Sequence, residues 1–236
     1  MILVYHIIPI NTTKDYYSKM DRKITVKKFN DNYFYKATIL FPEHQLEKIE
    51  SSSVEWLENT RKDVFFKKSG DKNFKQNKEH YPPEASSELL SNMNISSDYV
   101  WTNYLMTIKA HVLEYCKLTK VNYPKKIAST WVTRVADIDI PGSYDKNQLR
   151  SLRENHCMFG NMHSHKDNRI GVIFYLKNPD PKYGTLVRLN NTKIFQNNGE
   201  ENSLLIFNPE LYHTAIYPTE KDLQKSPRIT IVTDFI

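Results

Sequence analysis

The chain lacks several features that would place it in a simple class of protein. It has only two cysteines, Cys116 and Cys157, and their spacing excludes a cysteine-based metal or redox motif. This sparse cysteine usage makes a reducing cytoplasm the expected location. No apolar run approaches the length of a membrane span, so no membrane partner is expected. The apolar segment 1–10 has neither a basic leader nor a small-residue cleavage site and is predicted to form a strand.

Arginine clusters and nucleic-acid-binding motifs are also absent, although the formal net charge is +6. Much of the positive surplus lies between Arg61 and Lys78, where lysines alternate with Asn, Gln and Phe. We interpret this segment as a solvated, lysine-rich loop. The alternative is a patch that binds nucleic acid or another anion.

Length and composition favour one folded domain spanning residues 1–236, without internal repeats or a linker. Residues 1–126 are predicted to be a support region of helices and extra strands. A strand is expected from Asn32 to Phe41, and a helix from Pro42 to about Asn59. A second helix is expected after the cap Ser97. Its apolar stripe, predicted to pack on a sheet, consists of Trp101, Leu105, Ile108, Val112 and Tyr115.

After Pro124 the sequence changes to short β-rich runs separated by turn residues. The predicted strands are Ile127–Val135, Met158–His163, Gly171–Leu176, Thr185–Leu189, Leu204–Phe207, Tyr212–Tyr217 and Arg228–Phe235. Repeated short strands of this kind indicate a sandwich or barrel. We therefore expect an α+β protein with a jelly-roll core over residues 127–236. A long polar insertion, 137–156, interrupts this core and is interpreted as a lid or a surface loop.

Metal-ligating residue types gather at one turn, in His163-Ser-His165-Lys-Asp167, and His213 follows far downstream. Side chains two apart on a strand face the same side, so either His163 with His165 or His165 with Asp167 points into one cavity. A returning strand would bring His213 beside the pair. Three protein ligands leave other positions open for a co-substrate and oxygen. The few residues between Asp167 and the Gly171 strand favour the pair His163 and His165.

Three further residues are candidates for binding a co-substrate. Arg228 lies on the last predicted strand, where its guanidinium can clamp a carboxylate in bidentate fashion. Thr230 lies two residues on, on the same strand face, and offers a hydroxyl. Tyr175, in the Gly171–Leu176 run, supplies another donor.

The order of these motifs resembles that of the 2-oxoglutarate- and iron(II)-dependent oxygenases, and most closely those found in marine bacteria and their phages. The resemblance covers roughly residues 127–236 and includes the upstream Ser129-Thr-Trp131-Val segment. The other motifs that carry it are His163-Ser-His165, Gly171-Val-Ile-Phe-Tyr-Leu176, Gly184-Thr-Leu186, Leu204-Leu-Ile-Phe207, Leu211-Tyr-His213 and Arg228-Ile-Thr-Ile231.

This resemblance implies a double-stranded β-helix that holds Fe(II) and uses 2-oxoglutarate and O2. The implied reaction hydroxylates a C–H bond and releases succinate and CO2, and Arg228 is the implied partner of the co-substrate carboxylate. The family at large favours a His-x-Asp pair, which here would be His165 and Asp167. Spacing to the Gly171 strand instead aligns His163 with the first ligand, so we prefer His163, His165 and His213.

Two other functions remain open from the sequence. One is a non-catalytic, cupin-like jelly roll that binds metal. The other is a nucleic-acid-associated factor that uses segment 61–78. The substrate, whether a small molecule, a protein side chain or a nucleic acid, is not specified, because the motifs lie in the core and not in the loops that contact substrate.

Overall fold

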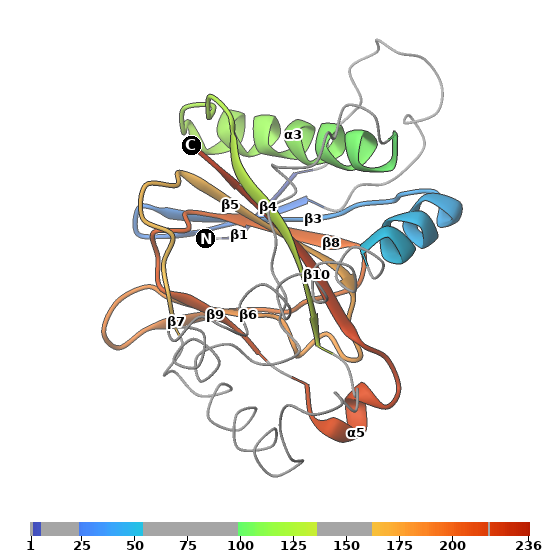
Figure 1. Ribbon diagram of the computed structural model, residues 1–236. Coiled ribbons are helices and arrows are strands. Elements are labelled where there is room, and N and C mark those ends of the chain that lie inside the picture. Colours follow the sequence, from blue (N-terminus) through green and yellow to red (C-terminus); the bar gives the residue numbers. More distant parts are fainter. Residues whose placement is uncertain (1, 6–23, 54–98, 136–161, 217) are drawn as a thin grey trace, which may run out of the picture.

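The computed structural model describes residues 2–5, 24–53, 99–135, 162–216 and 218–236. Two antiparallel sheets face each other in these ranges, and a long helix covers the outer side of the larger one (Figure 1). Several predicted features lie outside the described residues: the cap Ser97, Cys157, the basic segment Arg61–Lys78 and the insertion 137–156. None of the helices described is long and apolar enough to cross a membrane.

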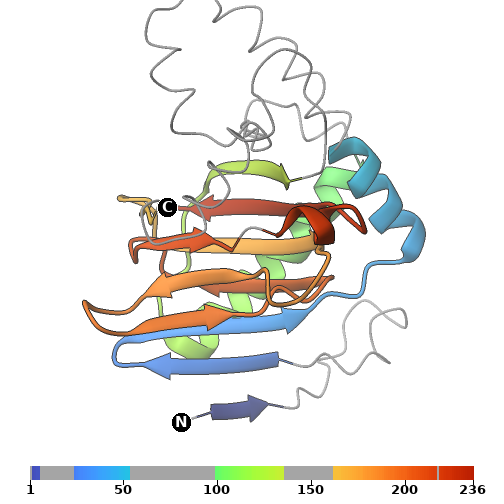
Figure 2. The same cartoon turned by 90° about the horizontal axis from the view of Figure 1, so that it is seen from below.

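The large sheet has seven strands in the order β1-β2-β3-β8-β5-β10-β4. Their bounds are Ile2–Tyr5 for β1, Ile24–Phe29 for β2, Asn32–Thr38 for β3, Ile127–Val135 for β4, Ile170–Lys177 for β5, Ser203–Phe207 for β8 and Arg228–Phe235 for β10. Figure 2 shows β1 at one edge of this sheet and β4 at the other. The N-terminal strands therefore extend the sheet that the second half of the chain builds.

The small sheet has three strands in the order β7-β6-β9. Their bounds are Thr185–Arg188 for β6, Ile194–Asn197 for β7 and His213–Ala215 for β9. His163 forms an isolated antiparallel bridge with His213 and so continues this sheet beyond β9.

The chain alternates between the two sheets as it proceeds. From β4 it passes to His163 beside the small sheet, to β5 in the large one, to β6 and β7 in the small one, and then to β8, β9 and β10 in turn. This connectivity is that of a double-stranded β-helix, so the predicted jelly-roll core and α+β class are confirmed.

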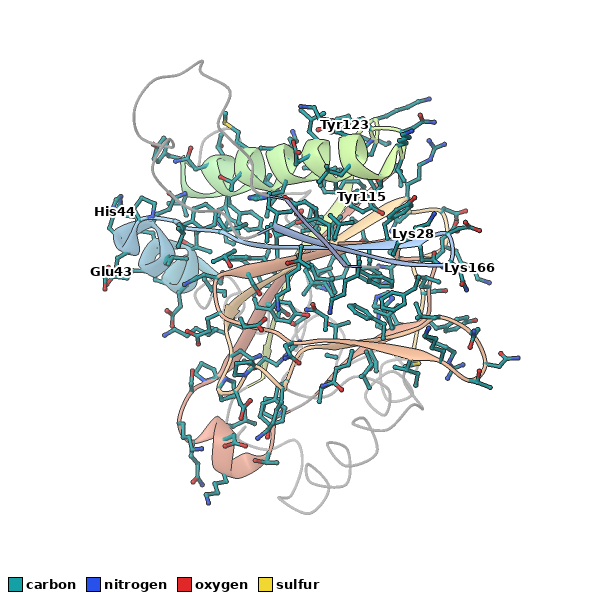
Figure 3. All side chains as sticks on the ribbon, turned by 180° about the vertical axis from the view of Figure 1, so that it is seen from behind. Lys28, Glu43, His44, Tyr115, Tyr123 and Lys166 are labelled. Carbon is teal, nitrogen blue, oxygen red and sulfur yellow. The ribbon has the colours of Figure 1, made fainter. Side chains whose placement is uncertain are left out.

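A helical layer packs against the outer face of the large sheet. Helix α3, Tyr99–Thr119, buries the whole predicted stripe there, together with Tyr104, His111 and Cys116. Tyr115 lies between α3 and the sheet (Figure 3), with its ring centroid 6.3 Å from that of Tyr35 on β3. A second helical segment spans 43–53 and buries Ile49 in the same core, and a short helix α5 spans Glu220–Leu223.

A second core fills the space between the two sheets. Its buried members are Phe34, Ile173, Tyr175, Val187, Phe195, Leu205 and Phe207. Because successive residues of a strand face opposite sides, β10 divides its side chains between the two cores. Ile229 and Ile231 pack in the helical layer, whereas Arg228, Thr230 and Asp234 make polar contacts on the other side. This polar inner face of β10 positions the candidate site.

Candidate metal centre and co-substrate pocket

Backbone pairing brings three histidines together. The N–H of His163 donates to the carbonyl of His213 at 3.0 Å, and the N–H of His213 donates back at 2.8 Å. Two residues further on, the N–H of His165 donates to the carbonyl of Pro209 at 2.9 Å. As a result, one ligand atom from each of His163, His165 and His213 lies within 4.8 Å of the others.

Hydrogen bonds orient two of these rings. The Nδ1–H of His213 donates to the carbonyl oxygen of Leu211 at 2.8 Å, and Nδ1 of His165 lies 2.6 Å from Oδ2 of Asp234. A carbonyl or carboxylate on Nδ1 fixes the proton there and leaves Nε2 as the ligand atom. Both rings therefore have Nε2 as the nitrogen that can bind a metal.

Burial reinforces the neutral state of His213. Its side chain is buried, and this desolvation is the main reason that its pKa is lowered to about 3. The neighbouring His163 and His165 lower the pKa further, whereas the hydrogen bond to the Leu211 carbonyl raises it. His163 is exposed and His165 is half-buried, so the cluster runs from the barrel interior to its surface. An imidazole that stays neutral near pH 7 is a competent ligand for first-row metals without first losing a proton.

Asp234 is a residue of this site that the sequence reasoning missed. It lies on the inner face of β10, is buried, and also accepts a hydrogen bond from Nδ2 of Asn168 at 2.8 Å. Its Oδ1 has no hydrogen-bond partner in the part of the chain that the structure describes. A signal did exist in the sequence, because Asp234 shares its strand face with Arg228 and Thr230.

Asp167 occupies a different position from the histidines. It is exposed and has a φ of 75°, which is the left-handed region typical of a turn residue. The three-histidine group is the metal-compatible cluster found among the described residues, and Asp167 is not part of it. Whether Asp167 or His163 serves a metal remains a prediction, and this placement favours His163.

Arg228 is buried between the two sheets and is held by backbone carbonyls. Its Nε donates to the carbonyl of Tyr183 at 3.0 Å and its Nη2 to that of Gly184 at 3.3 Å. The guanidinium carbon lies 5.9 Å from the centre of the Tyr175 ring. The cation is thereby fixed inside the barrel, on the same strand face as Asp234.

Tyr175 and Thr230 line the same interior. The Tyr175 hydroxyl lies 2.7 Å from the Thr185 hydroxyl and accepts from Nδ2 of Asn197 at 3.3 Å. Burial raises the pKa of Tyr175, which keeps the phenol protonated as a donor. The Thr230 hydroxyl lies 2.6 Å from that of Thr133 on β4. These contacts place all three predicted co-substrate residues in one polar strip between the sheets.

A polar clamp supports the loop that holds Arg228. The Tyr183 hydroxyl donates to Oδ2 of Asp222 at 2.6 Å, and Asp222 also accepts from Thr219 at 2.9 Å and Lys225 at 2.7 Å. These bonds, with that of Lys225 the largest cause, lower the pKa of Asp222 well below its usual range. The clamp ties the loop before β6 to α5, and it was not anticipated from sequence because Tyr183 and Asp222 are 39 residues apart.

No protein-family model matches the chain, and no curated protein matches it. Solved structures similar to it include a Pseudomonas putida prolyl-4-hydroxylase, with 9% identity, 86% of this chain and 87% of that chain covered, and a TM-score of 0.43. Another is the viral collagen prolyl hydroxylase of Paramecium Bursaria Chlorella virus-1 in a 2OG complex, with 11% identity, coverages of 85% and 93%, and a TM-score of 0.43. A third is HygX from Streptomyces hygroscopicus with nickel and 2-oxoglutarate bound, with 12% identity, coverages of 86% and 81%, and a TM-score of 0.40.

Proposed function

We propose that the chain is an iron(II)- and 2-oxoglutarate-dependent dioxygenase that hydroxylates a C–H bond of its substrate. In this reaction one oxygen atom of O2 enters the substrate as a hydroxyl. The other enters succinate, as 2-oxoglutarate loses CO2. The observation that carries the proposal is the joint presence of the histidine cluster and buried Arg228 on facing walls of one barrel.

His163, His165 and His213 would hold the iron. The donor set suits a first-row metal, because two of the three rings have their protons fixed on Nδ1 by the Leu211 carbonyl and the Asp234 carboxylate. When bound, Fe(II) supplies the activation of O2. An all-histidine set brings no negative charge of its own, and the Asp234 carboxylate behind His165 supplies one nearby.

Arg228 would bind the distal carboxylate of 2-oxoglutarate. Its planar guanidinium matches a carboxylate in geometry, and the surrounding barrel strengthens the attraction by excluding water. The Tyr183 and Gly184 carbonyls hold the cation in place. The hydroxyls of Tyr175 and Thr230 would add hydrogen bonds to the same carboxylate.

The experiment that tests this function is anaerobic reconstitution with Fe(II), followed by addition of 2-oxoglutarate and O2 and measurement of succinate. The proposal predicts succinate formation that requires iron and is lost in Arg228→Met. The assay is repeated with a broad panel of small-molecule, peptide and nucleotide substrates. If the protein binds iron but forms no succinate with any of them, a metal-binding jelly roll without turnover is favoured.

A further inference from the structure

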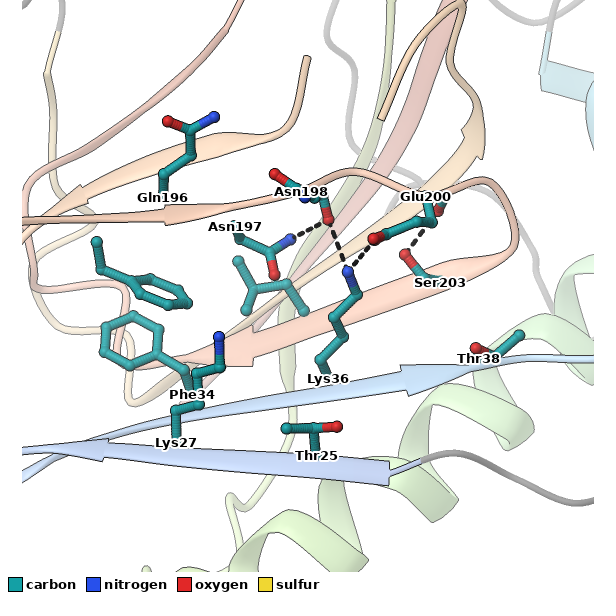
Figure 4. Close-up of a pocket in the computed structure, with 12 residues that line it drawn as sticks. Thr25, Lys27, Phe34, Lys36, Thr38, Gln196, Asn197, Asn198, Glu200 and Ser203 are labelled. Atoms are coloured by element: carbon teal, nitrogen blue, oxygen red, sulfur yellow. Dashed lines mark hydrogen bonds and ion pairs between the residues drawn. The ribbon is translucent and has the colours of Figure 1, made fainter. Parts of the chain in front are cut away.

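A cavity of about 450 Å³ lies between the sheets on the side formed by β2, β3, β7 and β8 (Figure 4). Its lining comes from these strands and from the turn that follows β7, and contains Thr25, Lys27, Phe34, Lys36, Thr38, Phe195, Gln196, Asn197, Asn198, Glu200, Ser203 and Leu205. None of the three clustered histidines and none of Arg228, Tyr175 and Thr230 lines it. The volume falls in the range of small-molecule sites.

One wall of the cavity is aromatic. The rings of Phe34 and Phe195 come from facing sheets and lie 4.2 Å apart between centroids, tilted by 39°. Leu205 extends the same apolar surface, and both phenylalanines are buried. A flat or apolar group of a ligand can therefore leave water by packing against this wall.

The opposite part of the lining is polar, and most of its groups already have partners. Lys36 forms an ion pair with Glu200 and donates to the carbonyl of Asn198 at 3.0 Å (Figure 4). The Ser203 hydroxyl donates to the carbonyl of Glu200 at 2.6 Å. This internal pairing leaves Lys36 and Glu200 with little net charge to offer a ligand.

Lys27 differs from Lys36. Its ammonium lies 5.7 Å from the centre of the Phe195 ring, and no carboxylate pairs with it among the residues that the structure describes. The hydroxyls of Thr25 and Thr38 lie on the same lining. The cavity thus presents one uncompensated cation beside an aromatic wall and several neutral hydrogen-bonding groups.

We propose that this cavity is a second ligand site, which binds a small carboxylate with an aromatic or apolar body. A single cation suits a monoanion, whereas a phosphate dianion would need further positive charge or a row of backbone N–H groups. The ring of the ligand packs against Phe34 and Phe195, and its carboxylate lies at Lys27. Asn197 forms the wall toward the barrel interior, where it donates to Tyr175.

The test is calorimetric titration of the full-length chain with 3-phenylpropionate, which carries both groups. The matched probes are 3-phenylpropan-1-ol, which keeps the ring without the charge, and acetate, which keeps the charge without the ring. We expect saturable binding of 3-phenylpropionate and affinities at least about tenfold weaker for the two partial probes.

Lys27→Gln should weaken binding of 3-phenylpropionate by at least about tenfold. Lys28→Gln is the matched control, because Lys28 is the next residue on β2, faces the other side and lies 5.2 Å over Tyr33. It should leave the affinity unchanged. An excess of 2-oxoglutarate should not displace the probe, because Arg228 does not line this cavity.

Three results would overturn the second site: no saturable binding of 3-phenylpropionate, equal affinity in Lys27→Gln, or competitive displacement of the probe by 2-oxoglutarate. The last would mean that the probe binds at the site proposed for 2-oxoglutarate, beside Arg228. These measurements need no iron and no turnover, so their outcome is separate from that of the proposed oxygenase.

Discussion

Nδ1 of His165 lies 2.6 Å from Oδ2 of Asp234, so a carboxylate on β10 of the large sheet orients a histidine whose own N–H donates to Pro209, in the loop between β8 and β9. Gly171 lies opposite Asp234 on β5 and is close to Pro209. A Cβ added there would lie 3.4 Å from Oδ1 of Asp234 and 3.0 Å from Cβ of Pro209. The carboxylate therefore acts behind the histidine cluster, in the place where metal sites commonly have a supporting acceptor.

Asp234→Asn should weaken Fe(II) binding by about 10–100-fold, because the amide orients His165 less firmly and removes a negative charge. Anaerobic titration of the metal-free chain with Fe(II) measures this. Asp167→Asn is the control, since Asp167 is exposed and outside the cluster. Equal losses in the two variants would contradict a special role for Asp234.

Arg228→Met should weaken binding of 2-oxoglutarate by at least about tenfold, which is the loss of a charge-assisted contact of roughly 1.5–3 kcal/mol. Calorimetry with the Fe(II)-loaded or Mn(II)-loaded protein measures the affinity, and metal content should stay unchanged. Arg169→Met, at an exposed arginine, serves as the control. An unaltered affinity of Arg228→Met for 2-oxoglutarate would contradict the role of Arg228 in binding it.

Gly184→Ala should destabilise the barrel and disturb Arg228. A Cβ on Gly184 would lie 1.8 Å from the carbonyl oxygen of Asn197, so β6 and β7 would have to separate. Strain of this kind costs about 1–3 kcal/mol or more in the free energy of unfolding, which urea denaturation measures. Gly171→Ala should cost less, because its nearest contact is the Pro209 side chain at 3.0 Å. The opposite ranking would contradict this packing.

Acid should destabilise the metal-free chain through His213. Its folded-state pKa of about 3 lies below the ordinary value of 6.5, so between these values the unfolded chain binds a proton that the folded chain does not. The free energy of unfolding should therefore fall as the pH drops from about 6.5 to 5, by at most about 1.4 kcal/mol per pH unit from this group. Denaturation at several pH values, compared between wild type and His213→Gln, isolates this slope. Identical pH dependence of the free energy of unfolding in the two proteins would contradict this contribution of His213.

The strands in the second half of the chain could be predicted, because each is a short apolar segment bounded by turn residues. β4 and β10 match their predicted bounds, β6 and β8 differ by one residue at one end, and β5 is longer by one residue at each end. β7 was missed, since Ile194–Asn197 is only four residues long and holds only two apolar residues, of which Ile194 is exposed. β2 was missed for a related reason: its lysines obscure the pattern, although Ile24 and Val26 are buried.

Proximity across the barrel was harder to predict than the strands. The histidine cluster could be predicted, because His163 and His165 are close in sequence and one downstream histidine lies in a predicted strand. The links from His165 to Asp234 and from Tyr183 to Asp222 join residues 69 and 39 positions apart. Such pairs depend on which strands become neighbours and on the course of the loops, and the hydrophobic periodicity of a single segment specifies neither.

The most direct test of the account is the Fe(II) stoichiometry and affinity of wild type, His163→Ala and Asp167→Ala under anaerobic conditions. If His163, His165 and His213 hold the metal, wild type and Asp167→Ala bind one Fe(II) per chain, and His163→Ala loses affinity by several orders of magnitude. Retention of tight, stoichiometric iron in His163→Ala with its loss in Asp167→Ala would contradict the three-histidine centre and assign the metal to His165, Asp167 and His213.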